Sequence, residues 1–386
     1  MAREWARTVY LDYQASTPTD PRVVQAMLPC FTEIGGNPHN RNHATGRAAA
    51  EAIERARAEV AALIGADPDE IVFTSGATEA NNLALQGIVA RLRPSRDHIV
   101  TCATDHSAVL EVCRALSTQG VRVTVLPVGR HGLIDLDQLA SAIDHRTALV
   151  SIAAVNNEIG VIQHVADIAA ICGRRGVLLH TDAAQAVGRV PIDVRYHGID
   201  LLSLSGHKLY GPKGIGALYI RDGFDTRPLP LFHGGGQEHG LRPGTLPTPL
   251  CVGLGAACAL AAREMAAEQH RVRELRDRLW LRLKTALPDL ILAGDPDRRI
   301  AGNLMVVLPG CDAVELQTEL SAEVAFSTGS ACASSTGRPS HVLSALGFSP
   351  NDAAGAMRLS VGRFTTEADI DFAAQRLTAA RRQLPR

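Results

Sequence analysis

Short β-rich runs alternate with helical stretches over residues 46–220, and this alternation limits the possible folds more than any other feature of the sequence. Apolar residues recur at helical spacing in Gly46–Ile64, Ser107–Gln119 and Val165–Arg175. The β-rich runs are Ile71–Thr74, His98–Ala103, Val121–Pro127, Ala148–Val155, Val177–His180, Leu201–Leu204 and Ile215–Ile220. Strands that alternate with helices predict an α/β fold with a mainly parallel sheet. In such a sheet the ligand lies beyond the carboxyl ends of the strands.

The pattern changes near Leu246. A long helical tract from Pro249 to Leu287 follows, and we expect it to break near Glu268. Short strands then mix with helices, at Asn303–Leu308, Val324–Ser327, Met357–Ser360 and the helix Glu367–Arg382. We therefore expect a large α/β domain over residues 18–262, and a smaller α+β domain built from residues 1–17 and 263–386.

Charge and composition exclude several classes of protein. The 39 basic and 40 acidic side chains leave a net charge of -1, and aromatics are only 4%, which argues against a nucleic-acid-binding surface. The longest apolar run, Leu250–Ala262, is too short to span a membrane, and Met1–Leu11 has no apolar signal core. We therefore expect a cytoplasmic enzyme that binds neither nucleic acid nor membrane.

The eight cysteines are scattered through the chain, which predicts reduced thiols rather than a disulfide framework. None lies two to four residues from another, so no zinc or iron–sulfur ligand run is present. His39 and His43 have the spacing of helical metal ligands, but the Gly, Pro and Asn around them are not helical. We expect no metal site.

Lys208 lies in a Gly-bracketed turn, residues 205–212, directly after the apolar strand at Leu201. A lysine just past a strand end is held at the ligand edge of the sheet, where it can form a Schiff base with an aldehyde once it loses a proton. The alternative is a solvated surface lysine. A phosphate-loop interpretation fails because Gly211 is followed by Pro-Lys-Gly.

Two further segments follow strand ends. Asp182 could pair with a protonated pyridine nitrogen, or could simply cap a helix. The turn at residues 75–82 could hold a phosphate on the free amides of its helix and the Thr78 hydroxyl. It could equally be an ordinary helix start with a capping-box acid.

Cys332 lies among small polar residues at 327–337, a segment too hydrophilic for a core. A thiol in such a loop is expected to be exposed and mobile, as a nucleophile requires. It would need a base or a cation nearby, because little of an ordinary thiol is ionised at neutral pH. The alternative is an incidental loop cysteine.

Taken together and in this order, these segments resemble the cysteine desulfurase family of the NifS and IscS type. That family belongs to the class-V, fold-type I enzymes that use pyridoxal 5'-phosphate (PLP). The resemblance covers nearly the whole chain. Besides the segments above, it rests on residues 11–13, 36–38, 155–160, 180–185, 242–245, 330–332 and 358–360.

The resemblance implies a fold-type I transferase fold and a role for each matching residue. Lys208 would hold PLP as a Schiff base and later move protons, and His106 would stack on the ring and act as an acid or base. The other implied cofactor contacts are Asp182 with the ring nitrogen, Gln185 with the ring hydroxyl, Asn157 beside the ring, and Ala77, Thr78, Ser205, His207 and Thr245 with the phosphate.

In this resemblance Thr245 acts from the neighbouring subunit, which implies a homodimer. Arg358 would bind the substrate carboxylate, with Asn157 and Asn37 near the substrate. Cys332 would attack the sulfur of L-cysteine, leaving L-alanine and a Cys332 persulfide. The sulfur would pass to an iron–sulfur scaffold or another acceptor, with tRNA thiolation as a further destination.

Two kinds of alternative remain open. One is a selenocysteine lyase or a related class-V lyase or aminotransferase, in which Cys332 is dispensable. The other is a sulfur-relay partner without catalysis.

Overall fold

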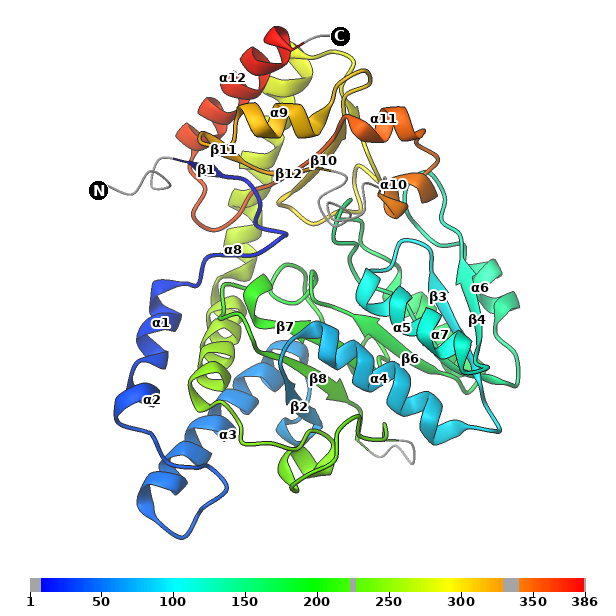
Figure 1. Cartoon of the computed structure of the whole chain (residues 1–386), viewed down its shortest axis with the longest axis vertical. Helices are drawn as coiled ribbons and strands as arrows, with labels where there is room; N and C mark the ends of the chain where they lie inside the picture. The colour runs from blue at the N-terminus through cyan, green and yellow to red at the C-terminus, as the bar shows by residue number, and fades with distance from the viewer. Residues whose placement is uncertain (1–7, 223–226, 329–339, 385–386) are drawn as a thin grey trace.

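The computed structural model describes residues 8–222, 227–328 and 340–384. Two units lie one above the other in Figure 1, and one long helix runs through both. The lower unit is built on a seven-stranded sheet with the order β2-β8-β7-β6-β5-β3-β4. These strands are β2 (Ile71–Thr74), β3 (His98–Cys102), β4 (Arg122–Leu126), β5 (Thr147–Ser151), β6 (Leu178–Asp182), β7 (Leu201–Ser205) and β8 (Gly216–Ile220). β8 alone runs opposite to the other six strands of this sheet, so the predicted mainly parallel sheet is confirmed.

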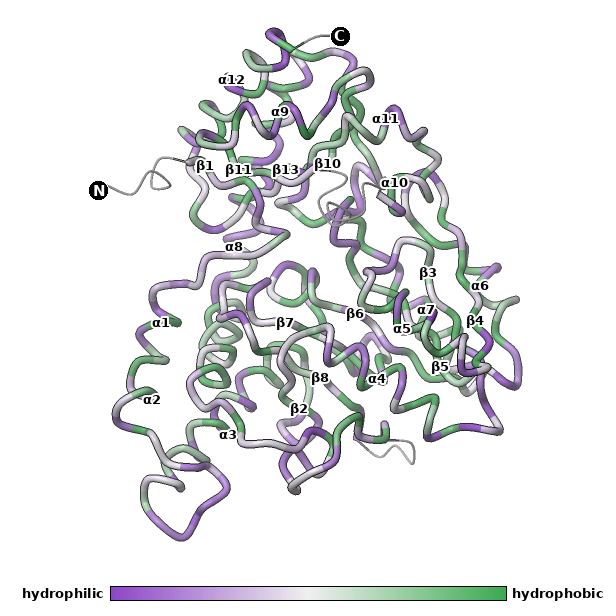
Figure 2. The backbone as a smooth tube through the Cα atoms, viewed as in Figure 1, coloured by the Kyte–Doolittle hydropathy of each residue, from purple (hydrophilic) through white to green (hydrophobic). Residues whose placement is uncertain are grey.

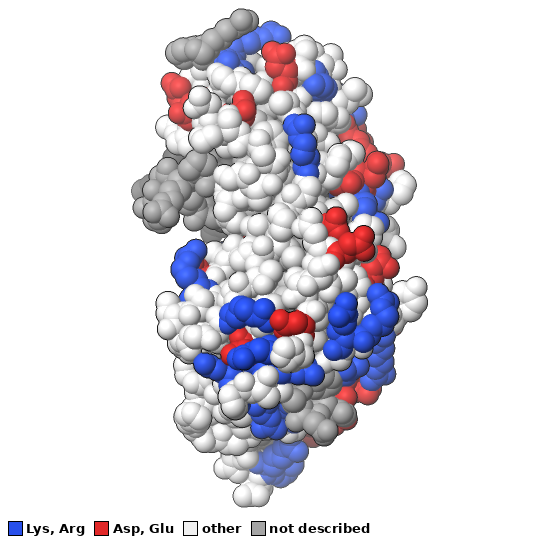
Figure 3. Space-filling view, turned by 90° about the vertical axis from the view of Figure 1, so that its right-hand side faces the viewer, with Lys and Arg blue, Asp and Glu red and all other residues white. Residues whose placement is uncertain are grey.

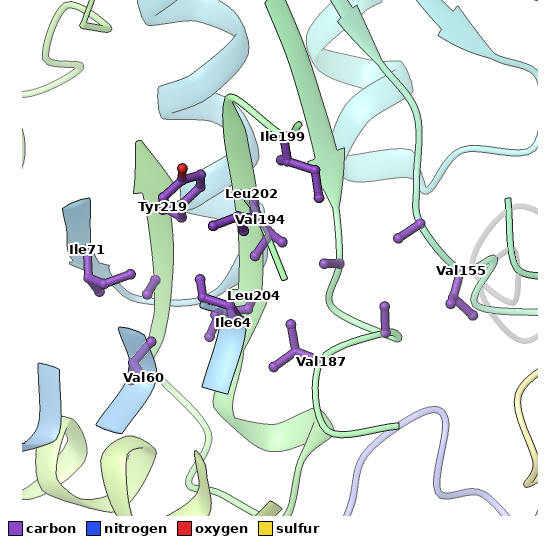
Figure 4. Close-up of a cluster of buried hydrophobic side chains, with 14 of the residues drawn as sticks. Val60, Ile64, Ile71, Val155, Val187, Val194, Ile199, Leu202, Leu204 and Tyr219 are labelled. Atoms are coloured by element: carbon purple, nitrogen blue, oxygen red, sulfur yellow. The ribbon is translucent and has the colours of Figure 1, made fainter. Parts of the chain in front are cut away.

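Helices cover both faces of this sheet, as expected for strands that are buried on both sides. They are α1 (Pro21–Met27), α2 (Pro29–Thr32), α3 (Ala44–Ile64), α4 (Ala77–Leu92), α5 (Ser107–Thr118), α6 (Leu136–Ala142) and α7 (Val165–Arg174), with short turns η2 (Pro68–Glu70), η3 (Gly206–Lys208) and η4 (Gln237–Gly240). Figure 4 shows Val60 and Ile64 of α3 facing Leu202, Leu204 and Tyr219 of the sheet. A second apolar cluster fills the opposite face.

The upper unit holds two smaller sheets. One is a four-stranded antiparallel sheet, β12-β13-β10-β9, and the other pairs β1 with β11 in parallel. Its elements are β1 (Val9–Tyr10), β9 (Ile291–Leu292), β10 (Asn303–Val307), α9 (Ala313–Glu319), β11 (Val324–Ala325), β12 (Ser327–Thr328), α10 (His341–Ala345), α11 (Pro350–Ala354), β13 (Ala356–Ser360) and α12 (Glu367–Gln383). The predicted single strand Val324–Ser327 is therefore wrong, because its two halves join different sheets.

The long helix α8 (Thr248–Ala286) is continuous over 39 residues, so the expected break near Glu268 is wrong. Its first half packs in the lower core and its second half in the upper core, so each half has an apolar partner. Gly255 allows close approach to α3, since a Cβ there would lie 2.6 Å from the Ala56 Cα. By length and composition α8 could cross a membrane. Its apolar residues, however, pack into the two cores.

The surface is polar but unevenly charged. Figure 2 shows apolar segments toward the centre and polar ones at outer loops, such as that between α2 and α3. On the face in Figure 3, Lys and Arg gather over the lower part. At the amino ends of the parallel strands, Arg122 pairs with Asp144 and Arg146 pairs with Asp97. Lys and Arg are therefore unevenly distributed, although acidic side chains pair with some of them.

Residues 9–17 connect the two units. Val9 pairs with Val324 of the upper unit, and the Gln14 amide donates to the Ser360 hydroxyl at 3.0 Å. A few residues on, the Thr17 amide donates to the His207 carbonyl of the lower unit at 2.9 Å. This segment therefore crosses the junction where the site described below is found.

Candidate active site

A cavity of about 890 Å³ opens at the carboxyl ends of the parallel strands, where the α/β pattern predicts a ligand. Its size lies in the range that holds a cofactor together with a small substrate. Many of the residues predicted from the sequence line it: Ala77, Thr78, His106, Asn157, Asp182, Gln185, Ser205, His207, Lys208 and Arg358. The chain positions of these residues differ widely, so their convergence is a property of the fold.

Lys208 ends the turn η3, directly after β7. Its Nζ donates to the carbonyl of Gln14 at 2.7 Å and to that of Ala15 at 2.8 Å. The turn is completed by Tyr210 at φ 64°, whose amide donates to the Thr17 hydroxyl. The lysine is thus held at the cavity wall by the segment that joins the two units.

Asp182 is the last residue of β6 and is buried. One carboxylate oxygen accepts from the Asn81 side chain at 2.7 Å, and the other accepts from the Ala184 amide at 2.9 Å. Two donors hold the carboxylate in one orientation at the cavity wall. An acid fixed in this way suits a partner that carries a proton on a ring nitrogen.

The helix α4 begins at the cavity with Gly76 as its N-cap and no side-chain cap. The first amides of a helix have no helical acceptor, and the helix dipole favours an anion there. Ser205 and His207 lie on the same wall. Burial, together with the positive charges of Lys208 and Lys213, lowers the pKa of His207 to about 4, so this ring is neutral at pH 7.

His106 follows β3 and caps α5, where its Nδ1 accepts from the Ala108 amide at 3.1 Å. The proton of the neutral ring therefore lies on Nε2. Burial lowers the pKa of His106, so the neutral form prevails at pH 7. The neighbouring Asp105 is fully buried, and burial raises its pKa to about 6.

Arg358 of β13 enters the cavity from the upper unit. It donates to the Asn157 carbonyl at 2.9 Å and to the Asp12 carboxylate at 3.0 Å. Its buried Nε–H has no acceptor among the described residues. A guanidinium with an unused donor is suited to bind a carboxylate.

Three predicted residues are not placed in this cavity. Cys332 lies outside the described residues. Asn37 does not line the cavity, because its side chain instead accepts from the His39 amide in its own loop. Thr245 is exposed on the surface of the single chain and does not line the cavity either.

The described residues that flank Cys332 are close to the cavity. Ser327 lines it, and Cys332 follows five residues later, a stretch that spans at most about 18 Å when fully extended. On the other side, Ser340 donates to the buried Glu158, and the ring Nε2 of His341 lies 3.0 Å from the Asp105 carbonyl. Chain length alone therefore allows the thiol to reach the cavity.

Several residues of the site escaped the sequence analysis. Asn81 orients Asp182, Asp12 pairs with Arg358, and the carbonyls of Gln14 and Ala15 hold Lys208. Asn81 left one usable signal, since it is a polar residue on the buried face of an apolar helix. The carbonyl contacts left none, because any residue type supplies a carbonyl.

Comparisons with known proteins agree with this geometry. The profile of the family described as aminotransferase class-V matches residues 9–372. The chain belongs to the class-V aminotransferase family. Among its relatives, a cysteine desulfurase of Mus musculus is 50% identical over 370 residues, 96% of this class-V chain and 80% of that protein. The cysteine desulfurase IscS of Rickettsia bellii is 49% identical over 365 residues, covering 95% and 89% of the two chains.

A solved structure of a NifS-like protein superimposes on this class-V chain with a TM-score of 0.91. The two are 35% identical, and the match covers 98% of this chain and 100% of that one. The fold-type I architecture expected from the sequence is therefore confirmed.

Members of this class-V family are PLP-dependent, and the cavity fits that cofactor. The uncapped start of α4 suits its phosphate, the fixed Asp182 carboxylate suits its ring nitrogen, and Lys208 suits its aldehyde. The cavity therefore offers a partner for the anion, for the basic ring and for the aldehyde of this cofactor.

Proposed function

We propose that this protein is a cysteine desulfurase, which converts L-cysteine to L-alanine and carries the sulfur as a persulfide on Cys332. The single observation that carries the proposal is the meeting of Lys208, Asp182 and Arg358 in one cavity, in a chain half identical to cysteine desulfurases. The first two residues suit the cofactor, and the third suits the carboxylate of an amino acid.

Each residue has a task in this reaction. PLP bound to Lys208 supplies the electron sink that allows the substrate α-carbon to lose its proton. Arg358 binds the substrate carboxylate, with Asn157 beside it, and so directs the α-hydrogen and the sulfur toward the reacting groups. Lys208 moves the proton at the α-carbon, and the neutral His106 exchanges a proton near the sulfur.

Sulfur transfer then requires a nucleophile. The Cys332 thiolate attacks the substrate sulfur, so a sulfur–sulfur bond forms while the bond from Cβ to sulfur breaks. The electron pair of the broken bond remains with the substrate carbon, which gains a proton and becomes the methyl group of L-alanine. No external oxidant is needed, because the substrate carbon is reduced as its sulfur is oxidised.

Two variants test this proposal. Lys208→Ala is expected to lose the yellow colour of the bound cofactor, because no amine remains to form the link; an unchanged visible spectrum would contradict the assignment. Cys332→Ser is expected to keep the colour but release less than about a hundredth of the sulfide from L-cysteine. Sulfide release from L-cysteine equal to that of the wild type would favour a lyase in which Cys332 is dispensable.

We also infer a cytoplasmic homodimer that delivers sulfur to an iron–sulfur scaffold or another acceptor protein. The inference is supported by the exposed Thr245, whose proposed contact with the phosphate requires a neighbouring subunit. Light scattering of the purified protein is expected to give twice the 41.0 kDa chain mass. A monomer that retained full activity would contradict the shared site.

A further inference from the structure

Arg189 lies behind the cavity, in the segment that follows β6, and binds three separate parts of the chain. Its Nη1 donates to Oε1 of Gln185, and its Nη2 donates to the carbonyls of Tyr13 at 3.0 Å and Lys208 at 3.1 Å. In the described part of the chain, no carboxylate lies within ion-pair distance of this guanidinium. An arginine held only by neutral acceptors keeps a positive charge that no neighbouring carboxylate neutralises.

The first contact determines which way the Gln185 amide faces. Arginine has only donors, so the Gln185 oxygen must face Arg189 and the nitrogen must face away from it. Accordingly, Nε2 of Gln185 donates to the Gln14 carbonyl at 2.9 Å, on the cavity side. Gln185 therefore presents a donor, and not an acceptor, to a group in the cavity.

The other two contacts hold the main chain around Lys208. The Gln14 carbonyl that accepts from Gln185 also accepts from the Lys208 Nζ at 2.7 Å. Arg189 binds the carbonyl of the preceding residue, Tyr13, and the carbonyl of Lys208 itself. The Arg189 guanidinium thus connects Lys208, the segment at residues 13–15 whose carbonyls hold that lysine, and Gln185.

We infer that Arg189 is a positioning residue, which fixes Gln185 as a hydrogen-bond donor toward the cofactor and holds the main chain on both sides of Lys208. The inference rests on the proposed function, because it assumes PLP bound at Lys208. Arg189 also brings a positive charge, since arginine stays protonated in proteins even though burial lowers its pKa. Both the donor and the charge stabilise a negative oxygen on the cofactor ring.

The proposal predicts a spectroscopic change. A ring oxygen that loses its donor and the nearby cation becomes more basic, so the bound cofactor keeps its proton to higher pH. In Arg189→Met holoenzyme the midpoint of the visible absorbance change with pH is expected to rise by roughly one unit. Arg189→Lys keeps the charge but not the two-armed geometry, so a smaller rise is expected.

Two controls make the measurement specific. Gln185→Ala should raise the midpoint as well, and adding Arg189→Met to it should raise it by less than Arg189→Met does alone, because the contacts act through the same side chain. Arg299 is a control for an arginine held by neutral acceptors: it is more deeply buried than Arg189, it donates to the carbonyls of Asp295 and Ala293 and to Asn303, and it does not line the cavity. Arg299→Met should leave the midpoint unchanged.

Each outcome decides the proposal. A midpoint in Arg189→Met and Arg189→Lys within 0.2 units (about the precision of a titration) of the wild type would overturn it, and so would an equal rise in Arg299→Met. If Arg189→Met does not fold, Arg189→Lys and Gln185→Ala carry the test. A wild-type protein that stays colourless with added PLP would instead refute the proposed function, so the two failures are distinguishable.

Discussion

At the scale of single residues, burial shifts the pKa values of His180 and Asp105, which lie behind the cavity, in opposite directions. His180 has a hydroxyl on each side, Ser151 at 2.8 Å and Ser203 at 3.0 Å, and burial lowers its pKa to about 4. Asp105 accepts from the Ala153 amide, and burial raises its pKa to about 6. Each side chain is thus held in its neutral form over part of the acid range.

His180 makes stability depend on pH. Its folded pKa lies below the unfolded value of about 6.5, so the unfolded chain binds the proton first. The contribution of His180 to the free energy of unfolding is complete above pH 6.5 and is lost as the pH falls toward 4. We expect urea unfolding to show about 2 kcal/mol less stability at pH 5 than at pH 7.5 from this group.

The comparison with His180→Asn isolates this effect. Asp105 acts with the opposite sign, because a raised pKa gives stability at low pH that is lost as pH rises from about 4 to 6. The pH dependence of the wild-type stability is therefore the sum of the His180 and Asp105 contributions. The variant should lose the His180 part, and an identical pH dependence in both proteins would contradict the prediction.

The sequence identified those site residues whose chemistry is in the side chain and whose place is a strand end. Lys208 and Asp182 belong to this class, and the structure places both in the cavity. The sequence did not identify Arg189, because this residue binds main-chain carbonyls, nor Gln14, because it contributes its own carbonyl. Thr245 could not be placed by a single chain, since its proposed role depends on a second subunit, and Asn37, expected near the substrate, does not line the cavity.

At the scale of elements, the turn η4 is held to the large sheet by a buried ion pair. Arg57 of α3 binds both oxygens of Glu238 at 2.8 and 2.7 Å, and the Phe73 amide of β2 donates to the same carboxylate. Glu238 and His239 have positive φ values of 47° and 54°. The ion pair therefore stabilises a backbone shape that two non-glycine residues disfavour.

Glu238→Gln is expected to lower the free energy of unfolding by about 3 to 5 kcal/mol, because it leaves the Arg57 charge without its buried counter-ion, with only the half-exposed Glu54 beside it. The double variant Arg57→Met with Glu238→Gln should lose less, since no charge remains buried. Glu54 provides the matched control: it also binds Arg57, at 3.1 Å, but its side chain is 50% exposed. Glu54→Gln should cost less than about 1 kcal/mol in the same urea titration, and equal losses in the two single variants would contradict the buried-pair argument.

Element boundaries were predictable where local signals were strong. The strand Ile71–Thr74 and the start of α4 near Thr78 follow from apolar runs bounded by Ser and Gly. The errors arose where tertiary contacts decide. Helix α8 continues past Glu268 because both units bury one of its faces, and Val324–Ser327 divides because its halves find different partners.

At the scale of the whole molecule, the two units have separate cores but are closely joined. Helix α8 contributes to both cores, and a third cluster packs Ile159 and Val161 against Met305, Val307 and Val342. The division into domains at residues 17 and 262 stays a prediction. The shared helix and the bridging cluster indicate that the units unfold together.

The prediction that the two units unfold together can be checked with two spectroscopic probes. Trp280 packs against the upper core, so its fluorescence, in a Trp5→Phe background, reports on that unit. Far-UV circular dichroism is dominated by the lower unit, which holds the larger sheet and more of the helices. We expect the same urea midpoint from both signals, and clearly separated midpoints would show that the units unfold independently.

The segment 9–17 also has a consequence for how the protein matures. Its contacts to Ser360 and Arg358 span 346 positions of the chain, nearly its entire length. During synthesis, this segment can reach these partners only after residues 358–360 have been made. The Gln14 and Ala15 carbonyls that accept from Lys208 are therefore synthesised early, while the segment that carries them is fixed only late in folding.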